Sequence, residues 1–201
     1  MIKRVLISVS DKTDLEKLVK ALGEYSVEIV SSGGTAKKIK EFGYEKLTEV
    51  SAYTGHPESP GGLLKTLHPR VHGGLLLSQG IPEHKEYMDK HGIKPFEMVV
   101  VNLYPFEETV AKGVDLLTAV ENIDIGGPTM IRSAAKAALL YGSVAVVTDP
   151  FQYSDIIKVL KANEGEIPTA MKRVLAEKAY ARTSAYDAAI VAYLEKEGKR
   201  K

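Results

Sequence analysis

Short apolar runs alternate along the chain with segments whose apolar residues recur at helical spacing. Runs rich in Val, Ile and Leu predict β-strands at residues 5–9, 27–31, 47–50, 98–103 and 144–147. The intervening segments predict helices over 15–22, from the 32–35 turn to about 42, 82–91 and 115–122, others starting at Pro128 and at Asp149-Pro150, and a long one over 168–195. This alternation predicts a single α/β domain, with a Rossmann-like parallel sheet between two layers of helices.

Two segments stand outside this alternation. Residues 51–74 are rich in Gly and Pro, which predicts largely irregular structure. Their histidines, His56, His68 and His72, follow no helical metal-binding spacing, so we expect no metal site there. At the other end, residues 196–201 are mostly charged and predict a solvated tail. We assign Tyr186 and Tyr193 of the long helix to packing or an interface rather than to catalysis.

The composition is that of an ordinary globular protein. Of 201 residues, 44% are hydrophobic and 26% charged, and the formal net charge is +1. Such a charge gives no reason to expect nucleic acid or a membrane surface as a partner. The absence of cysteine excludes disulfides and thiolate chemistry. Since no signal peptide and no membrane-length apolar run is found, we expect a cytoplasmic protein.

Polar turns follow the first two predicted strands. The first contains Ser10, Asp11 and Lys12, and the second is Ser32-Gly33-Gly34-Thr35. In a parallel sheet both turns lie at the carboxyl edge, where helix amino ends offer free amides and a favourable dipole to phosphate. Neither turn matches a P-loop or a dinucleotide-binding fingerprint, and taken alone such turns are more often only turns than ligand sites.

A third concentration of polar chemistry lies in residues 121–136. Asp124 precedes Gly126-Gly127, Pro128 is expected at the first position of a helix, and Lys136 lies about two turns further on. The stretch gathers a carboxylate, free amides and an ammonium, although a capped helix with a solvated lysine has the same pattern. Asn102 and Tyr104 close the fourth predicted strand at the same edge of the sheet, where Tyr104 is as typical of a core aromatic as of a site residue.

Together these motifs resemble a known family. The segments that carry the resemblance are residues 8–13, 32–36, 65–69, 71–74, 102–106, 123–128 and 132–136. In this order and spacing they are similar to the inosine monophosphate (IMP) cyclohydrolase domain of bifunctional purine biosynthesis proteins. The resemblance implies a methylglyoxal-synthase-like fold and closure of 5-formamidoimidazole-4-carboxamide ribotide to IMP, the last step of de novo purine synthesis. It also implies a nucleotide substrate, no metal or organic cofactor, and a homodimer.

The resemblance implies a role for each matching residue. Ser10, Asp11, Lys12, Ser32, Gly33, Gly34 and Thr35 would bind the 5′-phosphate, and Thr66 and Asn102 would also contact the substrate. Lys65, Tyr104, Asp124 and Lys136 would surround the reacting groups, with Lys136 as the proton-transfer residue oriented by Asp124. Backbone amides at Ile125, Gly126 and Gly127 would stabilise the oxyanion.

The chain departs from the family pattern at three points. Leu63 stands where the family has arginine, Ala137-Ala138 stand where it has Asn-His, and no formyltransferase domain follows. The chain is therefore either a stand-alone cyclohydrolase supplied by a separate enzyme or one domain of a longer protein. Two other functions remain open on the sequence: a regulatory nucleotide-binding module of the same fold, and a lyase like methylglyoxal synthase.

Overall fold

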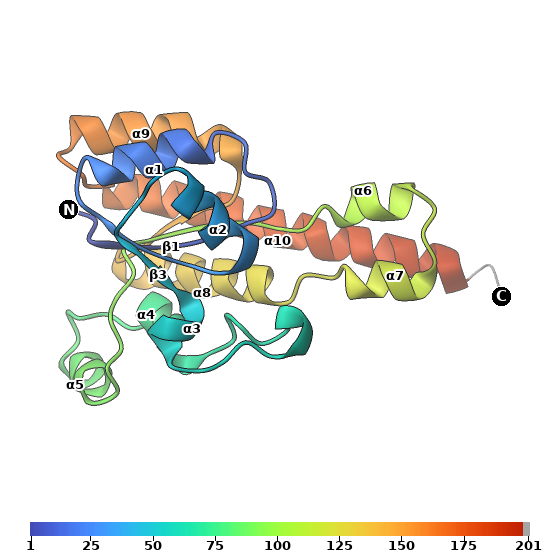
Figure 1. The fold of residues 1–201 in the computed structure, drawn as a ribbon, viewed down its shortest axis with the longest axis horizontal. Coiled ribbons are helices and arrows are strands. Elements are labelled where there is room, and N and C mark those ends of the chain that lie inside the picture. The colour runs from blue at the N-terminus through green and yellow to red at the C-terminus, as the bar shows by residue number, and fades with distance from the viewer. Residues whose placement is uncertain (199–201) are drawn as a thin grey trace.

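The five predicted strands form one parallel sheet. The structure is a computed structural model that describes residues 1–198 (Figure 1). The strands are β1 (Arg4–Val9), β2 (Glu28–Ser31), β3 (Leu47–Glu49), β4 (Met98–Asn102) and β5 (Ala145–Val147). Their order is β3-β2-β1-β4-β5, and each neighbouring pair is parallel. The order reverses between β1 and β4, and in such sheets this is where ligands bind.

Helices cover both faces of the sheet, as the alternation predicted. Helices α1 (Leu15–Gly23), α2 (Gly33–Glu41) and α9 (Tyr153–Ala162) lie on one face (Figure 1). Helix α8 (Gly126–Tyr141) lies on the other, packed against α4 (Pro69–Leu76) and α10 (Thr169–Gly198). Strand residues Val5, Leu6, Val99 and Val146 are fully buried between these layers. Their burial removes apolar surface from water on both faces of the sheet, which is the main stabilising term of such a fold.

Residues 51–74 are more regular than the sequence predicted. They contain α3 (Val50–Thr54), the short 3₁₀ helix η1 (Pro60–Gly62) and the first part of α4. The prediction was wrong where Pro60 and Pro69 begin helices instead of interrupting them, whereas residues 55–59 and 63–68 are turns and irregular structure, as predicted. Pro69 occupies the first turn of α4, where its missing amide costs nothing, and His68 caps that helix by accepting a hydrogen bond from Arg70 N at 3.1 Å.

One helix start also differs from prediction. Helix α8 begins at Gly126, so Pro128 is its third residue rather than its first. The third amide of a helix also lacks an intrahelical acceptor, which is why proline is tolerated there too. Helix α1 begins at Leu15, as predicted, and the residue before it, Asp14, makes no side-chain cap. In the turn that precedes this helix, the Asp11 carboxylate accepts a hydrogen bond from Thr13 N at 2.8 Å.

The remaining helices are α5 (Pro82–Lys90), α6 (Phe106–Ala111), α7 (Leu116–Glu121) and the 3₁₀ helix η2 (Pro150–Gln152). Of these, α6 was not predicted. Together with α7 and the end of α10 it forms a projection beyond the sheet (Figure 1).

The long helix was predicted and is confirmed as α10, with Tyr186 in the core. The expected solvated tail reaches residues 199–201, which lie outside the described residues.

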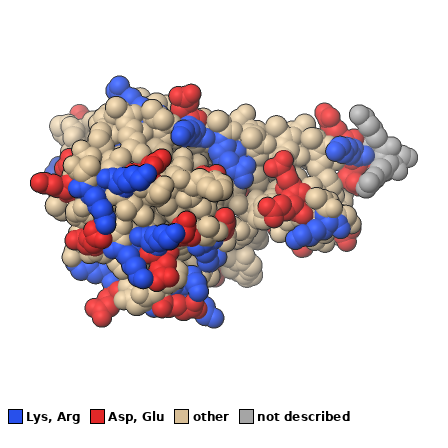
Figure 2. Space-filling model, turned by 90° about the horizontal axis from the view of Figure 1, so that it is seen from above, with Lys and Arg blue, Asp and Glu red and all other residues tan. Residues whose placement is uncertain are grey.

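The charged side chains are distributed without strong segregation on the face seen in Figure 2, where basic and acidic groups lie interspersed. No helix within residues 1–198 has the length and apolar character needed to span a bilayer.

Candidate active site

A cavity of about 560 Å³ opens at the carboxyl edge of the sheet, beside the β1–β4 switch point. The sequence-predicted residues that line it are Ser10, Lys12, Ser32, Gly34, Thr35, Lys65, Thr66, Asn102, Tyr104, Asp124, Ile125, Gly126 and Gly127. They come from the ends of β1, β2 and β4, from the segment before α4, and from the start of α8. The parallel sheet brings these elements together because all its strands end at one edge.

The turn after β1 is braced by Asn102 of β4. The side-chain oxygen Oδ1 of Asn102 accepts hydrogen bonds from Ser10 N at 2.7 Å and Asp11 N at 2.9 Å, and its side-chain nitrogen Nδ2 donates to Asp11 O at 2.8 Å. The side-chain amide of Asn102 thus shapes this turn. Lys12 Nζ folds back to donate to the carbonyls of Val9 and Ser10 at 3.3 and 3.2 Å. Its charge lies at the rim of the cavity.

The turn after β2 forms the neighbouring wall. Ser32 is the residue before α2, and its hydroxyl, although almost fully buried, meets no hydrogen-bond partner within residues 1–198. Thr35 Oγ1 donates to Val9 O at 3.0 Å and accepts from Val9 N at 3.1 Å, so it ties α2 to β1. The hydroxyl that this turn offers to a ligand is therefore Ser32, beside the free amides at the amino end of α2.

Lys65, Tyr104 and Asp124 line the other part of the cavity. Burial raises the pKa of the Asp124 carboxyl, while the backbone amides of Gly127 and Tyr104 and the positive charge of Lys65 pull that pKa back down. The ammonium of Lys65 also lies close to the start of α2, since a Cβ built on Gly33 would be 2.9 Å from its Nζ. Lys65 thus lies between the phosphate turns and Asp124.

The glycine pair at the start of α8 is required by close packing. A Cβ on Gly126 would be 2.5 Å from Thr66 Oγ1, and one on Gly127 would be 2.5 Å from Asp124 Oδ2. Gly127 N donates to Asp124 Oδ1 at 2.8 Å, so this amide already has an acceptor. The glycines thereby let the 65–66 segment and Asp124 approach the amino end of the helix.

Three predicted residues lie outside the lining of this cavity. Lys136 is exposed on α8, and the lysine whose positive charge lowers the Asp124 pKa is Lys65. Asp11 is exposed, and its side chain serves the turn. Gly33 is exposed, and its backbone lies close to Lys65 Nζ. Leu63, where the family has arginine, does line the cavity and is 75% exposed.

Sequence reasoning missed some residues of the site. Glu121 and Asn122, at the end of α7, line the cavity. The signal was present, because both lie at the start of the polar stretch 121–136. Tyr186 was assigned to packing, yet its hydroxyl accepts a hydrogen bond from Asp124 N at 2.8 Å across 62 residues of sequence. A contact between residues so far apart leaves no local pattern.

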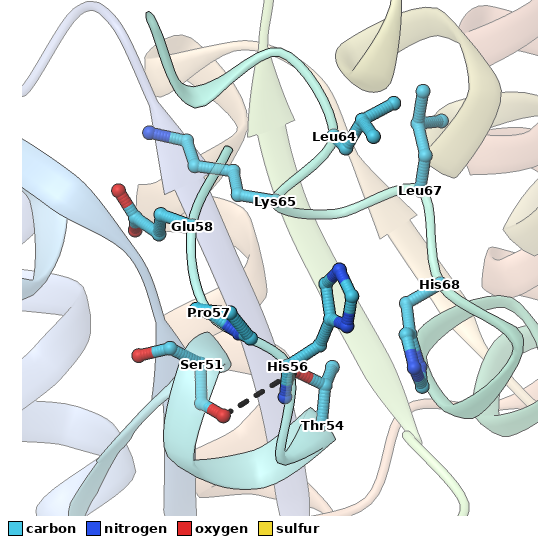
Figure 3. Close-up of a pocket in the computed structure, with 9 residues that line it drawn as sticks. All are labelled: Ser51, Thr54, His56, Pro57, Glu58, Leu64, Lys65, Leu67 and His68. Atoms are coloured by element: carbon cyan, nitrogen blue, oxygen red, sulfur yellow. Dashed lines mark hydrogen bonds between the residues drawn. The ribbon is translucent and has the colours of Figure 1, made fainter. Parts of the chain in front are cut away.

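A smaller cavity adjoins the first, with Lys65 lining both. Figure 3 shows the Lys65 side chain extending away from the rings of His56 and His68, whose centroids are 6.0 Å apart. His72 is directed elsewhere, with its Nδ1 3.0 Å from Ser133 Oγ. Within the described residues no group of three His, Cys, Asp or Glu side chains is arranged to hold a metal ion.

Comparison with known proteins places the chain in a family. The MGS-like domain family matches residues 14–129, and the AICARFT/IMPCHase bienzyme family matches residues 134–201. The chain therefore belongs to the family of MGS-like domains, as its fold and the position of its cavity indicate. The resemblance inferred from its motifs is confirmed.

More particular relatives carry the name "Bifunctional purine biosynthesis protein PurH". The protein from Magnetococcus marinus is 52% identical over 98% of this chain, and that from Brucella canis is 51% identical over 94%. The chain spans 37% and 34% of the length of these two relatives. Among solved structures, "Crystal structure of ForH" matches with a TM-score of 0.80 and 30% identity, over 95% of this chain and 98% of that chain.

Proposed function

We propose that this chain is an IMP cyclohydrolase, which closes 5-formamidoimidazole-4-carboxamide ribotide to IMP with loss of water. The observation that carries the proposal is a single cavity that joins a phosphate-type corner to a group of Lys65, Tyr104 and Asp124. Phosphate binding by itself requires only the first of these. The 52% identity to a purine biosynthesis protein and the match to the AICARFT/IMPCHase bienzyme family support the same activity.

In this proposal, one end of the cavity binds the 5′-phosphate. Lys12 supplies a positive charge, Ser32 a hydroxyl, and the start of α2 free amides and a helix dipole. Anchoring the phosphate leaves the imidazole ring and its two substituents at the end lined by Lys65, Tyr104 and Asp124. Because the nucleophile and electrophile belong to one molecule, holding them in register lowers the entropic part of the barrier.

Ring closure forms a carbon–nitrogen bond and then expels water, and both stages require proton transfer. The carboxamide nitrogen attacks the formyl carbon and loses a proton, which we assign to the Asp124 carboxylate. The formyl oxygen becomes an oxyanion, which Lys65 and Tyr104 stabilise by hydrogen bonding and protonate. The resulting hydroxyl then takes the proton held by Asp124 and leaves as water. The former formamide nitrogen returns a proton to the Lys65 and Tyr104 pair, which gives the double bond of the purine ring and restores both groups. The raised pKa of Asp124 suits a general base, since proton transfer is most effective when that pKa approaches the working pH.

We further propose that residues 1–201 form the cyclohydrolase unit, a cytoplasmic homodimer whose substrate comes from a formyltransferase. The relatives named as bifunctional are about three times longer than this chain, which supports a second activity outside it. The similarity to ForH covers 98% of that chain, which supports a unit of this extent. Sedimentation of the purified chain tests the dimer.

One assay tests the function. The formamido ribotide is added to the purified chain and ring closure is followed by ultraviolet absorbance, with dihydroxyacetone phosphate as the comparison substrate. We expect IMP from the ribotide and no product from the triose phosphate. Methylglyoxal formation would instead support a lyase of the same family. Binding of IMP without turnover of either substrate would support a regulatory nucleotide-binding module.

A further inference from the structure

Asp124 is held at two points by different parts of the fold. Its carboxylate oxygen Oδ1 accepts from Gly127 N at 2.8 Å, which fixes the side chain against the start of α8. Its own backbone amide donates to Tyr186 Oη at 2.8 Å, which fixes the main chain against α10. The first contact is local, whereas the second ties the site to a helix more than sixty residues away in the sequence.

The Tyr186 ring is itself held firmly. It is 3% exposed and lies edge-on to Phe106, with the ring centroids 6.2 Å apart. Phe106 starts α6, and its amide donates to Tyr104 O at 2.8 Å. Tyr186 therefore contacts both walls that carry the reacting groups. Its hydroxyl holds the Asp124 turn, and its ring packs on the residue that is bonded to Tyr104.

We propose that Tyr186 is a positioning residue that sets the placement of the Asp124 carboxylate relative to Tyr104 and Lys65. The proposal rests on the proposed function for its kinetic consequences, but the placement of Asp124 can be measured without turnover. Without the Tyr186 hydroxyl, the Asp124 amide becomes a partly buried donor with no acceptor, and the turn must move to reach one. Burial and the negative charge of Asp124 raise the Tyr186 pKa, so the group stays a neutral hydroxyl, whose oxygen accepts the hydrogen bond from the Asp124 amide.

The test variant is Tyr186→Phe, which keeps the ring and its packing on Phe106 and removes only the hydroxyl. Because a misplacement of about 1 Å at a reacting group can cost about 100-fold, we expect kcat to fall about 10- to 100-fold. The substrate KM and the affinity for IMP should stay close to those of the unchanged protein. The matched control is Tyr180→Phe on the same helix, where the ring faces Arg132 and not Phe106. It should leave kcat unchanged.

Two results would overturn the proposal. One is an unchanged kcat in Tyr186→Phe, and the other is a loss of IMP affinity as large as the loss of kcat, which indicates general disruption. The carboxyl of Asp124, followed by carbon NMR in the absence of substrate, provides an independent readout. Its titration should shift in Tyr186→Phe and not in Tyr180→Phe, and an unshifted titration would count against the role. If the unchanged protein lacks cyclohydrolase activity, the proposed function fails, while this titration still decides the role of Tyr186.

Discussion

Asp124 fills the space that a side chain at Gly127 would need. Gly127 N donates to one carboxylate oxygen at 2.8 Å, and a Cβ on Gly127 would lie 2.5 Å from the other and 2.7 Å from Leu103 Cδ2. Gly127→Ala should therefore force the Asp124 carboxylate out of place. We expect a loss of about 1–3 kcal/mol in the free energy of unfolding, the usual cost of overpacking. Urea denaturation measures it.

Gly34→Ala is the matched control for that stability measurement. A Cβ at Gly34 would meet nothing within 4 Å, and this residue lies in the first turn of α2. Replacing glycine with alanine at an unstrained helical position stabilises a protein by about 0.4–1 kcal/mol. Equal destabilisation by the two substitutions would show that the crowding at Gly127 is not the cause.

Ser32→Ala should separate affinity from stability. The Ser32 hydroxyl is buried and meets no partner within the described part of the chain, so its burial opposes folding. The alanine variant should be as stable as the unchanged protein or more so, by about 1 kcal/mol. It should nevertheless bind IMP more weakly, because the hydroxyl is proposed to bind the phosphate. Thermal unfolding and calorimetry measure the two effects, and a variant that loses stability but not affinity would assign Ser32 to the fold alone.

Lys12→Ala should weaken IMP binding by about one to two decades, since a charge-assisted hydrogen bond contributes about 1.5–3 kcal/mol. The control is Lys37→Ala, which removes an exposed lysine of α2 outside the cavity lining. Calorimetry with IMP distinguishes the two variants. The same IMP affinity in both variants would show that the phosphate does not bind at the turn after β1.

Asp124 and Lys65 should act as one proton-transfer unit. We expect Lys65→Ala and Asp124→Asn each to lower kcat far more than IMP affinity. The double variant should cost little more than the worse single change, because residues that act together in catalysis are strongly non-additive. Lys136→Ala provides the comparison, since this lysine is exposed on α8 and should have a smaller effect. If Lys136→Ala lowered kcat as much as Lys65→Ala, the proton-transfer role would belong to Lys136, the residue implied by the family resemblance.

The raised pKa of Asp124 should make the free energy of unfolding depend on pH. Burial raises the pKa of Asp124 above its ordinary value of 3.8, so the folded state favours the protonated carboxyl. The resulting stabilisation is complete below the pKa that Asp124 has in the unfolded state. It is lost as pH rises through the pKa that Asp124 has in the folded state. Relative to Asp124→Asn, the unchanged protein should therefore lose stability as pH rises from about 4 towards neutrality. Urea denaturation across this range measures the difference.

Asp115 provides a control of opposite sign. Hydrogen bonds from Thr118 lower the Asp115 pKa below 3.8, so its contribution is present above the unfolded pKa and lost as pH falls. Compared with Asp115→Asn, the unchanged protein should lose stability at the acid end of the same series. The same trend for both aspartates would show that burial does not set the Asp124 pKa.

The sequence determined the layout of the sheet and much of the site. The sequence of a buried parallel strand is a continuous apolar run. The polar turns that follow such strands lie at one edge of the sheet, because all the strands end there. For that reason the turns at Lys12 and Ser32, the strand end at Tyr104 and the glycines of α8 could all be assigned to one region. Helix starts were less certain, because proline is compatible with several positions in a first turn, as Pro128 shows.

The tertiary structure decided which of the side chains that line the cavity have their polar groups hydrogen-bonded within the fold. Thr35 and Asn102 have the right chemistry for a ligand, yet their hydrogen bonds go to Val9 and to the turn after β1. Such choices depend on neighbours across the sheet that no local pattern encodes. The same holds for the contact of Tyr186 with Asp124, because helical periodicity predicts that a residue is buried but not which buried polar group it will meet.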